Sequence, residues 1–392
     1  MAATGLKAED FLRAAGGSLR TAHCAAQRPD ALDVLAAGLG PGPLALVILF
    51  ASPEADCRQL PEHAAKAFPG TPVIGCTTAG EISHEGYTEG EIVAVGLPSE
   101  NFAVELMPIA DLDAIDRDSL VGGMIRSRMS VGARHPDWPG EFAFLLIDGL
   151  SVKEDELTSA MASGVGPVPL FGGSAGDGTR FSETFVFFDG KAHSHAAVVA
   201  FVRTRCPVKV FNFDHLHPTG RRMVVTRATP ARRIVHQINA EPAAFEYARI
   251  LGKYAGDLDT FTFAAHPVVV RIGGRHHVRS IQRMLPDGDL VFFSAIDEGL
   301  VLTLAEAEDM VAHLERELNA LSENGPPDAI LACDCILRRI EAHEKQMFGQ
   351  ISNLLAQHRV VGFSTYGEQL GPMHVNQTIT GVAIYPPAQD RQ

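Results

Sequence analysis

The sequence has few cysteines, no long apolar run and no excess of positive charge. Six cysteines among 392 residues are too few for a disulfide framework, which favours a reducing compartment. No apolar run approaches the roughly 20 residues that a membrane-spanning helix needs. The 33 basic and 47 acidic residues give a net charge of −14, which argues against a nucleic-acid scaffold. The N-terminus also lacks a signal peptide's basic and apolar stretches, so we expect a cytoplasmic protein that binds neither nucleic acid nor membrane.

Familiar catalytic and nucleotide-binding motifs are also missing. The glycine-rich segments match neither the Walker pattern nor the dinucleotide fingerprint. No Ser-His-Asp order, His-Glu-x-x-His motif or paired-acid spacing argues for an enzyme. We therefore predict a protein without catalytic activity. The alternative is a hydrolase-type enzyme that uses Thr78 or Ser174 as its nucleophile.

What the sequence does contain is one pattern repeated three times. An apolar run leads into a helical segment, and a second apolar run then breaks into a loop with glycine and hydroxyl residues that ends in Gly-Glu or Gly-Asp. The copies comprise 46–50 with 72–81, 144–148 with 169–177, and 329–333 with 360–368. This repetition predicts an α/β fold of strand-helix-strand-Gly-loop units, with additional β-hairpins and with sheets covered by helices.

The length and the local patterns together suggest three segments. The Ala-rich stretch 6–37 predicts one or two helices, so we expect residues 1–38 to form an N-terminal helical segment. A boundary near 226 then gives one domain over 39–226 and a second over 227–392.

Three local signals refine the secondary structure. Ser151, with Glu154 three residues later, predicts a capping box at a helix start. Asp189-Gly190 predicts the turn of a hairpin whose second strand lies in 196–202. Residues 304–321 show the strongest amphipathic helix pattern in the chain.

The three loops are the main candidates for a ligand site. Turns rich in glycine and hydroxyl groups expose backbone N–H groups that suit carboxylates and phosphates. The acid at the end of each loop either contacts a ligand or accepts backbone N–H groups to hold the turn. Arg338 either binds an anionic ligand or is a solvated surface residue. The candidate ligand-binding residues are Gly75, Thr77, Thr78, Gly80, Glu81, Gly172, Gly173, Ser174, Asp177, Arg338, Ser364, Thr365, Tyr366, Gly367, Glu368 and Asn376.

Histidines provide a second set of candidates. His215 and His217 alternate in a polar stretch just before Pro218-Thr219-Gly220. A neutral imidazole is a natural axial ligand of haem iron, so this pair is our candidate for haem binding. The alternative at each position is an ordinary hydrogen-bonded histidine.

The motifs together resemble the FIST family of bacterial signal-transduction proteins. The matching stretches are 72–82, 171–177, 218–220 with 224–228, and 362–368 with 376–378. They occur in the expected order and cover nearly the whole chain. The family has a FIST N-terminal domain followed by a FIST C domain, which agrees with the boundary near 226.

The resemblance implies ligand sensing rather than catalysis. FIST proteins are thought to bind small ligands, with amino acids proposed, and one branch binds haem and senses nitric oxide. Because no kinase or cyclase segment is attached, the resemblance implies a separate partner: a histidine kinase, or a diguanylate cyclase or phosphodiesterase. Our first hypothesis is a haem-binding nitric oxide sensor, and a homodimer is a further expectation. The alternative is a sensor of an amino acid or a similar metabolite.

Overall fold

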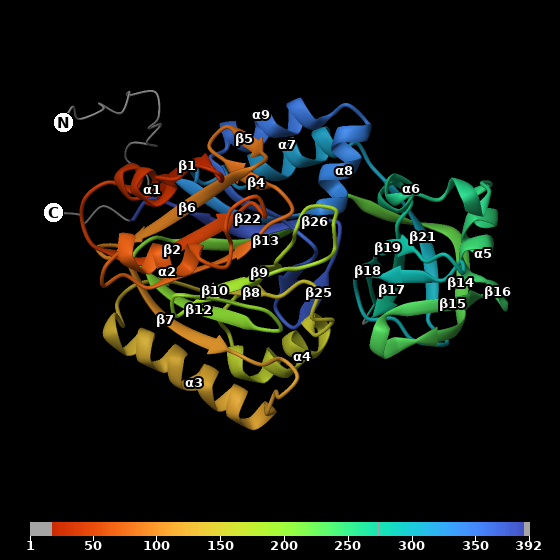
Figure 1. Ribbon diagram of the computed structural model, residues 1–392, viewed down its shortest axis with the longest axis horizontal. Coiled ribbons are helices and arrows are strands. Elements are labelled where there is room, and N and C mark those ends of the chain that lie inside the picture. The colour runs from red at the N-terminus through yellow and green to blue at the C-terminus, as the bar shows by residue number, and fades with distance from the viewer. Residues whose placement is uncertain (1–17, 273, 388–392) are drawn as a thin grey trace.

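The computed structural model describes residues 18–272 and 274–387, and its larger part is built from three units with the same strand order (Figure 1). Each unit has two parallel strands joined by a helical connection. These elements are β2 (Leu44–Ala51), α2 (Leu60–Ala67) and β3 (Val73–Thr77); β8 (Gly140–Ile147), α4 (Glu154–Val165) and β9 (Leu170–Ser174); and β22 (Ala329–Cys335), α8 (Ile336–Glu344), α9 (Phe348–Gln357) and β23 (Val360–Thr365). The predicted α/β fold with repeated units is confirmed.

Two antiparallel strands and a helix complete each unit. A return strand pairs with the first parallel strand, and an outer strand pairs with the return strand. The return strands are β6 (Glu91–Pro98), β12 (Ala197–Thr204) and β26 (Thr378–Ile384), and the outer strands are β1 (Arg20–Ala25), β7 (Phe102–Ile109) and β13 (Val208–Asp214). The helices between outer and parallel strands are α1 (Ala31–Leu39), α3 (Arg117–Arg134) and α7 (Met310–Ala320).

The hairpin that follows each glycine-rich loop belongs to the sheet of another unit. These hairpins are β4 (Glu81–Ser83) with β5 (Gly86–Thr88), β10 (Val186–Phe188) with β11 (Lys191–His193), and β24 (Glu368–Leu370) with β25 (Met373–Val375). The first pairs with β23, the second with β3 and the third with β9. Each unit therefore gives a hairpin to one neighbour and receives one from the other. This closed cycle of exchanges brings the three loops together.

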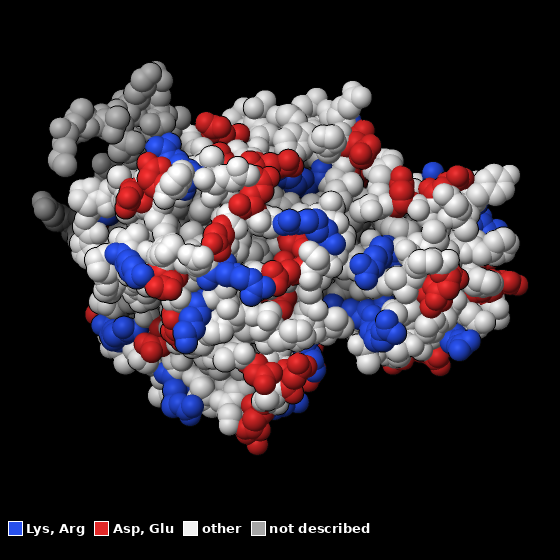
Figure 2. All heavy atoms as spheres, in the orientation of Figure 1, with Lys and Arg blue, Asp and Glu red and all other residues white. Residues whose placement is uncertain are grey.

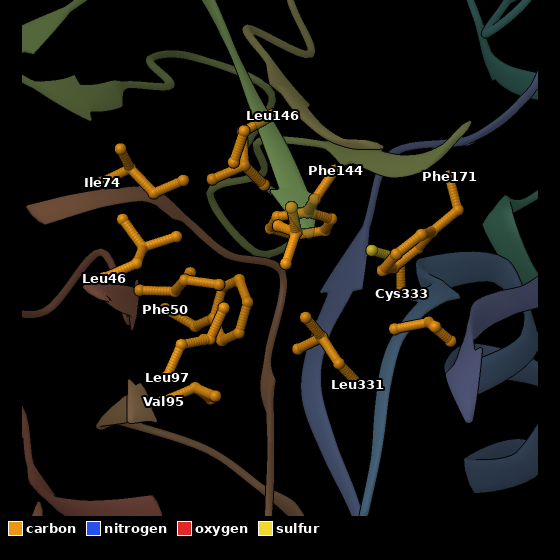
Figure 3. Packing of buried hydrophobic residues seen from close by; sticks show 14 of the residues in the cluster. Leu46, Phe50, Ile74, Val95, Leu97, Phe144, Leu146, Phe171, Leu331 and Cys333 are labelled. Carbon is orange, nitrogen blue, oxygen red and sulfur yellow. The ribbon is translucent and has the colours of Figure 1, made fainter. Parts of the chain in front are cut away.

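The three sheets share one apolar core and have separate outer cores. On β2, Leu46, Ile48 and Phe50 lie in the shared core, whereas the alternating Val47 and Leu49 pack beneath α1 and α2. Figure 3 shows Leu46 and Phe50 in this shared core with Phe144 and Leu331, which come from the other two sheets. Because both faces of each sheet are buried, the strands appear in the sequence as continuous apolar runs.

A glycine on the second parallel strand of each unit allows the close approach of its neighbour. A Cβ atom at these positions would lie about 2 Å from a carbonyl oxygen of the preceding strand, well inside van der Waals contact. The pairs are Gly75 with Leu49, Gly172 with Leu145, and Gly362 with Ala332. Part of the repeated glycine pattern therefore reflects strand packing.

The third unit contains a separate β-rich domain between its outer strand and α7. We call residues 216–307 the inserted domain; it lies at the right of Figure 1. Its strands are β14 (Leu216–Thr229), β15 (Ile234–Ile238), β16 (Glu241–Pro242), β17 (Val268–Ile272), β18 (Arg275–Arg279), β19 (Ile281–Met284), β20 (Leu290–Phe292) and β21 (Val301–Ala307), and its α-helices are α5 (Ala243–Leu251) and α6 (Thr260–Ala265). It has its own apolar core, which includes Met223, Tyr247 and Phe292.

Several local predictions need correction. The boundary placed between residues 226 and 227 falls inside β14, because the strand continues through that point. Residues 20–25 form β1 instead of helix, and the part of that prediction over residues 1–17 lies outside the described residues. The C-terminal part of the amphipathic stretch forms α7, and its first four residues belong to β21.

Two other local predictions, the hairpin turn and the capping box, are only partly confirmed. The turn at Asp189-Gly190 exists, but it joins β10 to the short β11, because β12 pairs with β7 and β8. Helix α4 begins at Glu154, and its cap position, Lys153, makes no side-chain cap bond. The carboxylate of Glu154 instead binds Arg233 of the inserted domain, with 2.6 Å between Oε2 and Nη2.

The surface in Figure 2 carries interspersed acidic and basic side chains, and this face shows no extended basic patch. Among the described residues, no helix combines the length and apolar character needed to cross a bilayer.

Candidate functional site

The three glycine-rich loops meet through backbone hydrogen bonds. We name them loop 1 (78–81), loop 2 (175–185) and loop 3 (366–368). Ser364, just before loop 3, donates its N–H to the carbonyl of Gly80 at 2.7 Å, and the N–H of Gly178 reaches the carbonyl of Thr78 at 3.2 Å. The N–H of Ser174 donates to the carbonyl of Gly367 at 2.9 Å. Residues far apart in the sequence therefore form one continuous junction.

The acids that end loops 1 and 3 hold the exchanged hairpins in place. Glu81 accepts hydrogen bonds from the hydroxyl of Thr78 and from the N–H of Glu91, the latter at 3.1 Å. Glu368 plays the corresponding part by accepting the N–H and hydroxyl of Thr378. Burial raises the pKa of Glu81 to about 7, against the effect of those hydrogen bonds. Burial likewise raises the pKa of Glu368 well above its usual value.

Asp177 has a different environment within loop 2. It accepts backbone N–H groups from Phe181, Ser182 and Glu183, at 2.8 to 3.0 Å, and the hydroxyl of Tyr366. Burial acts to raise the pKa of Asp177, but the hydrogen bonds outweigh it and hold that pKa below its usual range. Asp177 is thus an ionised acceptor that organises loop 2.

The hydroxyl and amide side chains predicted at this site also bind other parts of the chain. Thr77 accepts the N–H of Phe185 at 3.0 Å, and Thr365 donates to the carbonyl of Ser174 at 2.7 Å. The hydroxyl of Ser174 accepts a hydrogen bond from Gln369 at 2.9 Å. In this conformation these groups stabilise the loop junction.

A cleft of about 560 Å³ opens beside this junction, and we call it the loop cleft. It lies at the carboxyl end of β3, where ligands of open α/β sheets commonly bind. Four of the predicted residues line it: Thr78, Gly80, Glu81 and Asp177. The rest of its wall includes Ser52, Pro53, Glu54, Ala79, Glu89, Gly90, Gly178, Thr179, Arg180, Ile336, Arg339, Ile340, His343, Glu344 and Phe348.

Another cleft, of about 760 Å³, lies beside Asp328 and Arg359, which precede β22 and β23. It therefore opens at the amino ends of that parallel pair. We favour the loop cleft as the functional site despite its smaller volume, because loops 1 and 2 both line it.

Arg339 connects α8 to loop 1. Its guanidinium donates to the backbone carbonyl of Thr88 at 2.7 Å and lies 3.2 Å from the carboxylate of Glu89. A Cβ atom at Gly80 would lie 2.6 Å from the Arg339 Cζ atom, and the φ of Gly80 is +126°. Glycine is therefore required at position 80, both for its backbone conformation and for the approach of Arg339.

The neighbouring Arg338 points away from the cleft into a buried polar network. Its Nε atom lies 2.7 Å from Asp334 Oδ1, and its Nη1 atom lies 2.9 Å from His215 Nδ1. The Tyr87 hydroxyl donates to the second oxygen of Asp334, and Glu341 approaches His215 Nε2 at 3.6 Å. Arg338 is therefore a structural residue in this conformation and does not line the loop cleft.

The histidine pair does not form a haem pocket in this structure. His215 is fully buried in the network of Arg338, and burial lowers its pKa, with Glu341 acting in the opposite direction. His217 is exposed and lies 3.7 Å from the carboxylate of Glu308. Neither histidine lines the loop cleft or the cleft at the opposite strand ends. A haem group would therefore need a rearrangement of packed residues around His215.

Loop 3 is covered by the inserted domain. The ring of Tyr366 packs against Phe181 and Phe293, with 4.8 and 5.9 Å between ring centroids. Asn376 accepts a hydrogen bond from Ser294 of the inserted domain. Gly367 cannot carry a side chain, because a Cβ atom there would lie 2.2 Å from the ring of His374. Loop 3 therefore belongs to the junction but lines none of the loop cleft.

Most of the cleft wall was absent from the residues predicted from sequence. Arg180, His343 and Phe348 line it, yet they come from loop 2, α8 and α9. In the sequence, the adjacent pair Arg338 and Arg339 was the one feature that pointed to this part of the wall. Their spacing could not show which of the two faces the cleft, since that depends on how α8 packs.

Two adjacent parts of the chain match domain models of the same family. Residues 45–241 match the model of the FIST N domain, and residues 243–371 match the model of the FIST C domain. A search of curated proteins finds no match. The border between the two matches lies within the inserted domain, after β16.

Proposed function

The chain belongs to the FIST family, and from that premise we propose that it senses a small polar ligand in the loop cleft. FIST domains are associated with small-ligand sensing in signal transduction and are sensory rather than catalytic. The observation that carries the proposal is the position of the cleft beside the junction of the repeated loops.

The charged side chains of the cleft support a ligand that carries both a positive and a negative charge. Arg180 and Arg339 bring guanidinium groups to its wall, and Glu54 and Glu89 bring carboxylates. Phe348 adds an apolar surface on the side of α9. An amino acid or a similar metabolite carries an ammonium, a carboxylate and a side chain, which match these three kinds of group. We therefore propose this ligand class.

Helix α8 supports a route from ligand to signal. Ile336 and Arg339 line the cleft, while Ile336 and Leu337 also belong to an apolar cluster with Ala264 and Phe293 of the inserted domain. A ligand that shifts α8 would therefore change the contact with the inserted domain, and differential binding to the two arrangements would shift their populations.

The inserted domain also offers a surface for a signalling partner. Phe245 on α5 is 54% exposed and Tyr254, just after that helix, is 83% exposed, so two aromatic rings face solvent here. We propose that a separate histidine kinase or cyclic-dinucleotide enzyme contacts this surface.

A thermal-shift panel of amino acids and related metabolites tests the proposal, because a ligand that binds only the folded state raises the melting temperature. We expect at least one zwitterionic compound to give a saturable shift that Arg180→Ala reduces and that Arg126→Ala, on α3, preserves. Arg126 is an exposed arginine away from the cleft wall. Equal shifts in all three proteins would exclude the loop cleft as the binding site.

A further inference from the structure

Two histidines and a glutamate that are distant in sequence come together at the edge of the first unit. His23 lies on β1, and His84 and Glu85 form the turn between β4 and β5. One possible ligand atom from each residue lies within 4.8 Å of the others. The two imidazole rings have centroids 4.6 Å apart. The exchange of the hairpin creates this cluster, since β1 and β4 belong to different sheets.

The groups around these residues favour metal binding. His23 Nδ1 lies 2.9 Å from the carboxylate of Glu91, which leaves Nε2 available to an ion. A carboxylate on the far nitrogen is the usual partner of a metal-bound histidine, because it fixes the ring and its tautomer. The Nε2 atom of His84 is buried and has no hydrogen-bond partner among the described residues.

We propose that His23, His84 and Glu85 form a site for a divalent transition metal such as zinc. Two imidazoles and one carboxylate form a common zinc ligand set, with water in the fourth position. Tetrahedral zinc with bonds of about 2.1 Å separates its ligands by about 3.4 Å, so the three atoms must move slightly closer. The Glu85 side chain is 58% exposed and can make this adjustment.

The metal would tie the first exchanged hairpin to the edge of its parent sheet. It would link β1, in the sheet of β2, to the turn of a hairpin that pairs with β23. That hairpin begins with Glu81, which lines the loop cleft and accepts the N–H of Glu91. The site stands independently of the proposed ligand, because none of its three metal-binding side chains lines the loop cleft.

Calorimetric titration of the chelator-treated full chain with zinc chloride tests this inference, with cobalt(II) absorption as a probe of coordination. We expect one zinc per chain with micromolar or tighter affinity, and visible cobalt bands of a four-coordinate site. His84→Ala should abolish stoichiometric binding, and Glu91→Gln should weaken it by about 10- to 100-fold. His63→Ala is the matched control, because His63 is an exposed histidine of α2 outside the cluster.

Thermal unfolding separates binding at this cluster from other effects. Zinc should raise the melting temperature of the original protein and of His63→Ala, but not that of His84→Ala. If His84→Ala does not fold, Glu85→Gln provides the same comparison through an exposed side chain. The inference is overturned if zinc binding does not saturate, or if one zinc per chain remains bound in His84→Ala or in Glu85→Gln.

Discussion

Loops 1 and 3 follow corresponding strands and both end in Gly-Glu, yet only loop 1 opens to a cleft. Glu81 and Glu368 each accept the N–H of the first residue of a return strand, so the two loops share one structural role. Loop 3 is closed by Phe293 and Ser294 of the inserted domain, whereas Glu81 and Gly80 face the loop cleft. The repeated sequence thus specifies architecture, and the elements that cover each loop decide which one can meet a ligand.

All three units share the close strand packing that a glycine allows, and replacing one of these glycines should have the largest effect. We expect Gly172→Ala to lower the free energy of unfolding by about 3 kcal/mol or more, because the new Cβ atom would collide with the carbonyl of Leu145. Denaturant titration measures this change. Gly349→Ala is the control, since its position in α9 has open space and alanine favours helix by up to about 1 kcal/mol. Equal stability of the two variants would contradict the packing explanation.

The repeated units could be predicted because their signals are local. Each parallel pair is buried on both faces, so its strands stand out as apolar runs, and the same loop composition follows each one. The exchange of hairpins could not be predicted in this way. Nothing in the short stretch around Glu81 shows that it pairs with Phe363 instead of a strand of its own unit.

The inserted domain and its docking contacts also lack a local signal. The chain passes from β13 into β14 through Asp214 and His215 without a linker rich in glycine or proline. Glu154 fits a helix cap in sequence, yet its carboxylate is used by Arg233, which lies 79 residues later. Of the candidate site residues, those at the cleft were identifiable by their loop position. Arg180 and Phe348 were not, because they reach the cleft only through tertiary packing.

The buried acids Glu81 and Glu368 should make the stability of the protein depend on pH. The pKa of Glu81 is raised in the folded state, so the folded protein retains this proton while the unfolded chain loses it. Stability should therefore fall as pH rises from about 4.5 to about 7, by roughly 2 to 3 kcal/mol from this group. Glu81→Gln should remove this part of the decline, as measured by denaturant titration across that range.

Two further variants complete this test. Glu368→Gln should flatten the pH dependence with the same sign, because burial raises the pKa of that acid as well. Glu344→Gln, at an exposed residue of α8, should leave the profile of the original protein in place. An unchanged profile in Glu81→Gln would mean that the carboxyl group of Glu81 is better solvated than its position implies.

The smallest effect is expected from haemin, because His215 is fully buried among packed side chains. That imidazole is enclosed by Arg338 and Glu341, unlike the side chains that line the loop cleft. Haemin added to the purified protein should give weak, broad absorbance that does not saturate at one equivalent, and His215→Ala should give the same spectrum. His217→Ala controls for binding to the exposed neighbour. A sharp stoichiometric Soret band that is lost in His215→Ala would instead show that the buried network opens, and the region around His215 would become the candidate ligand site.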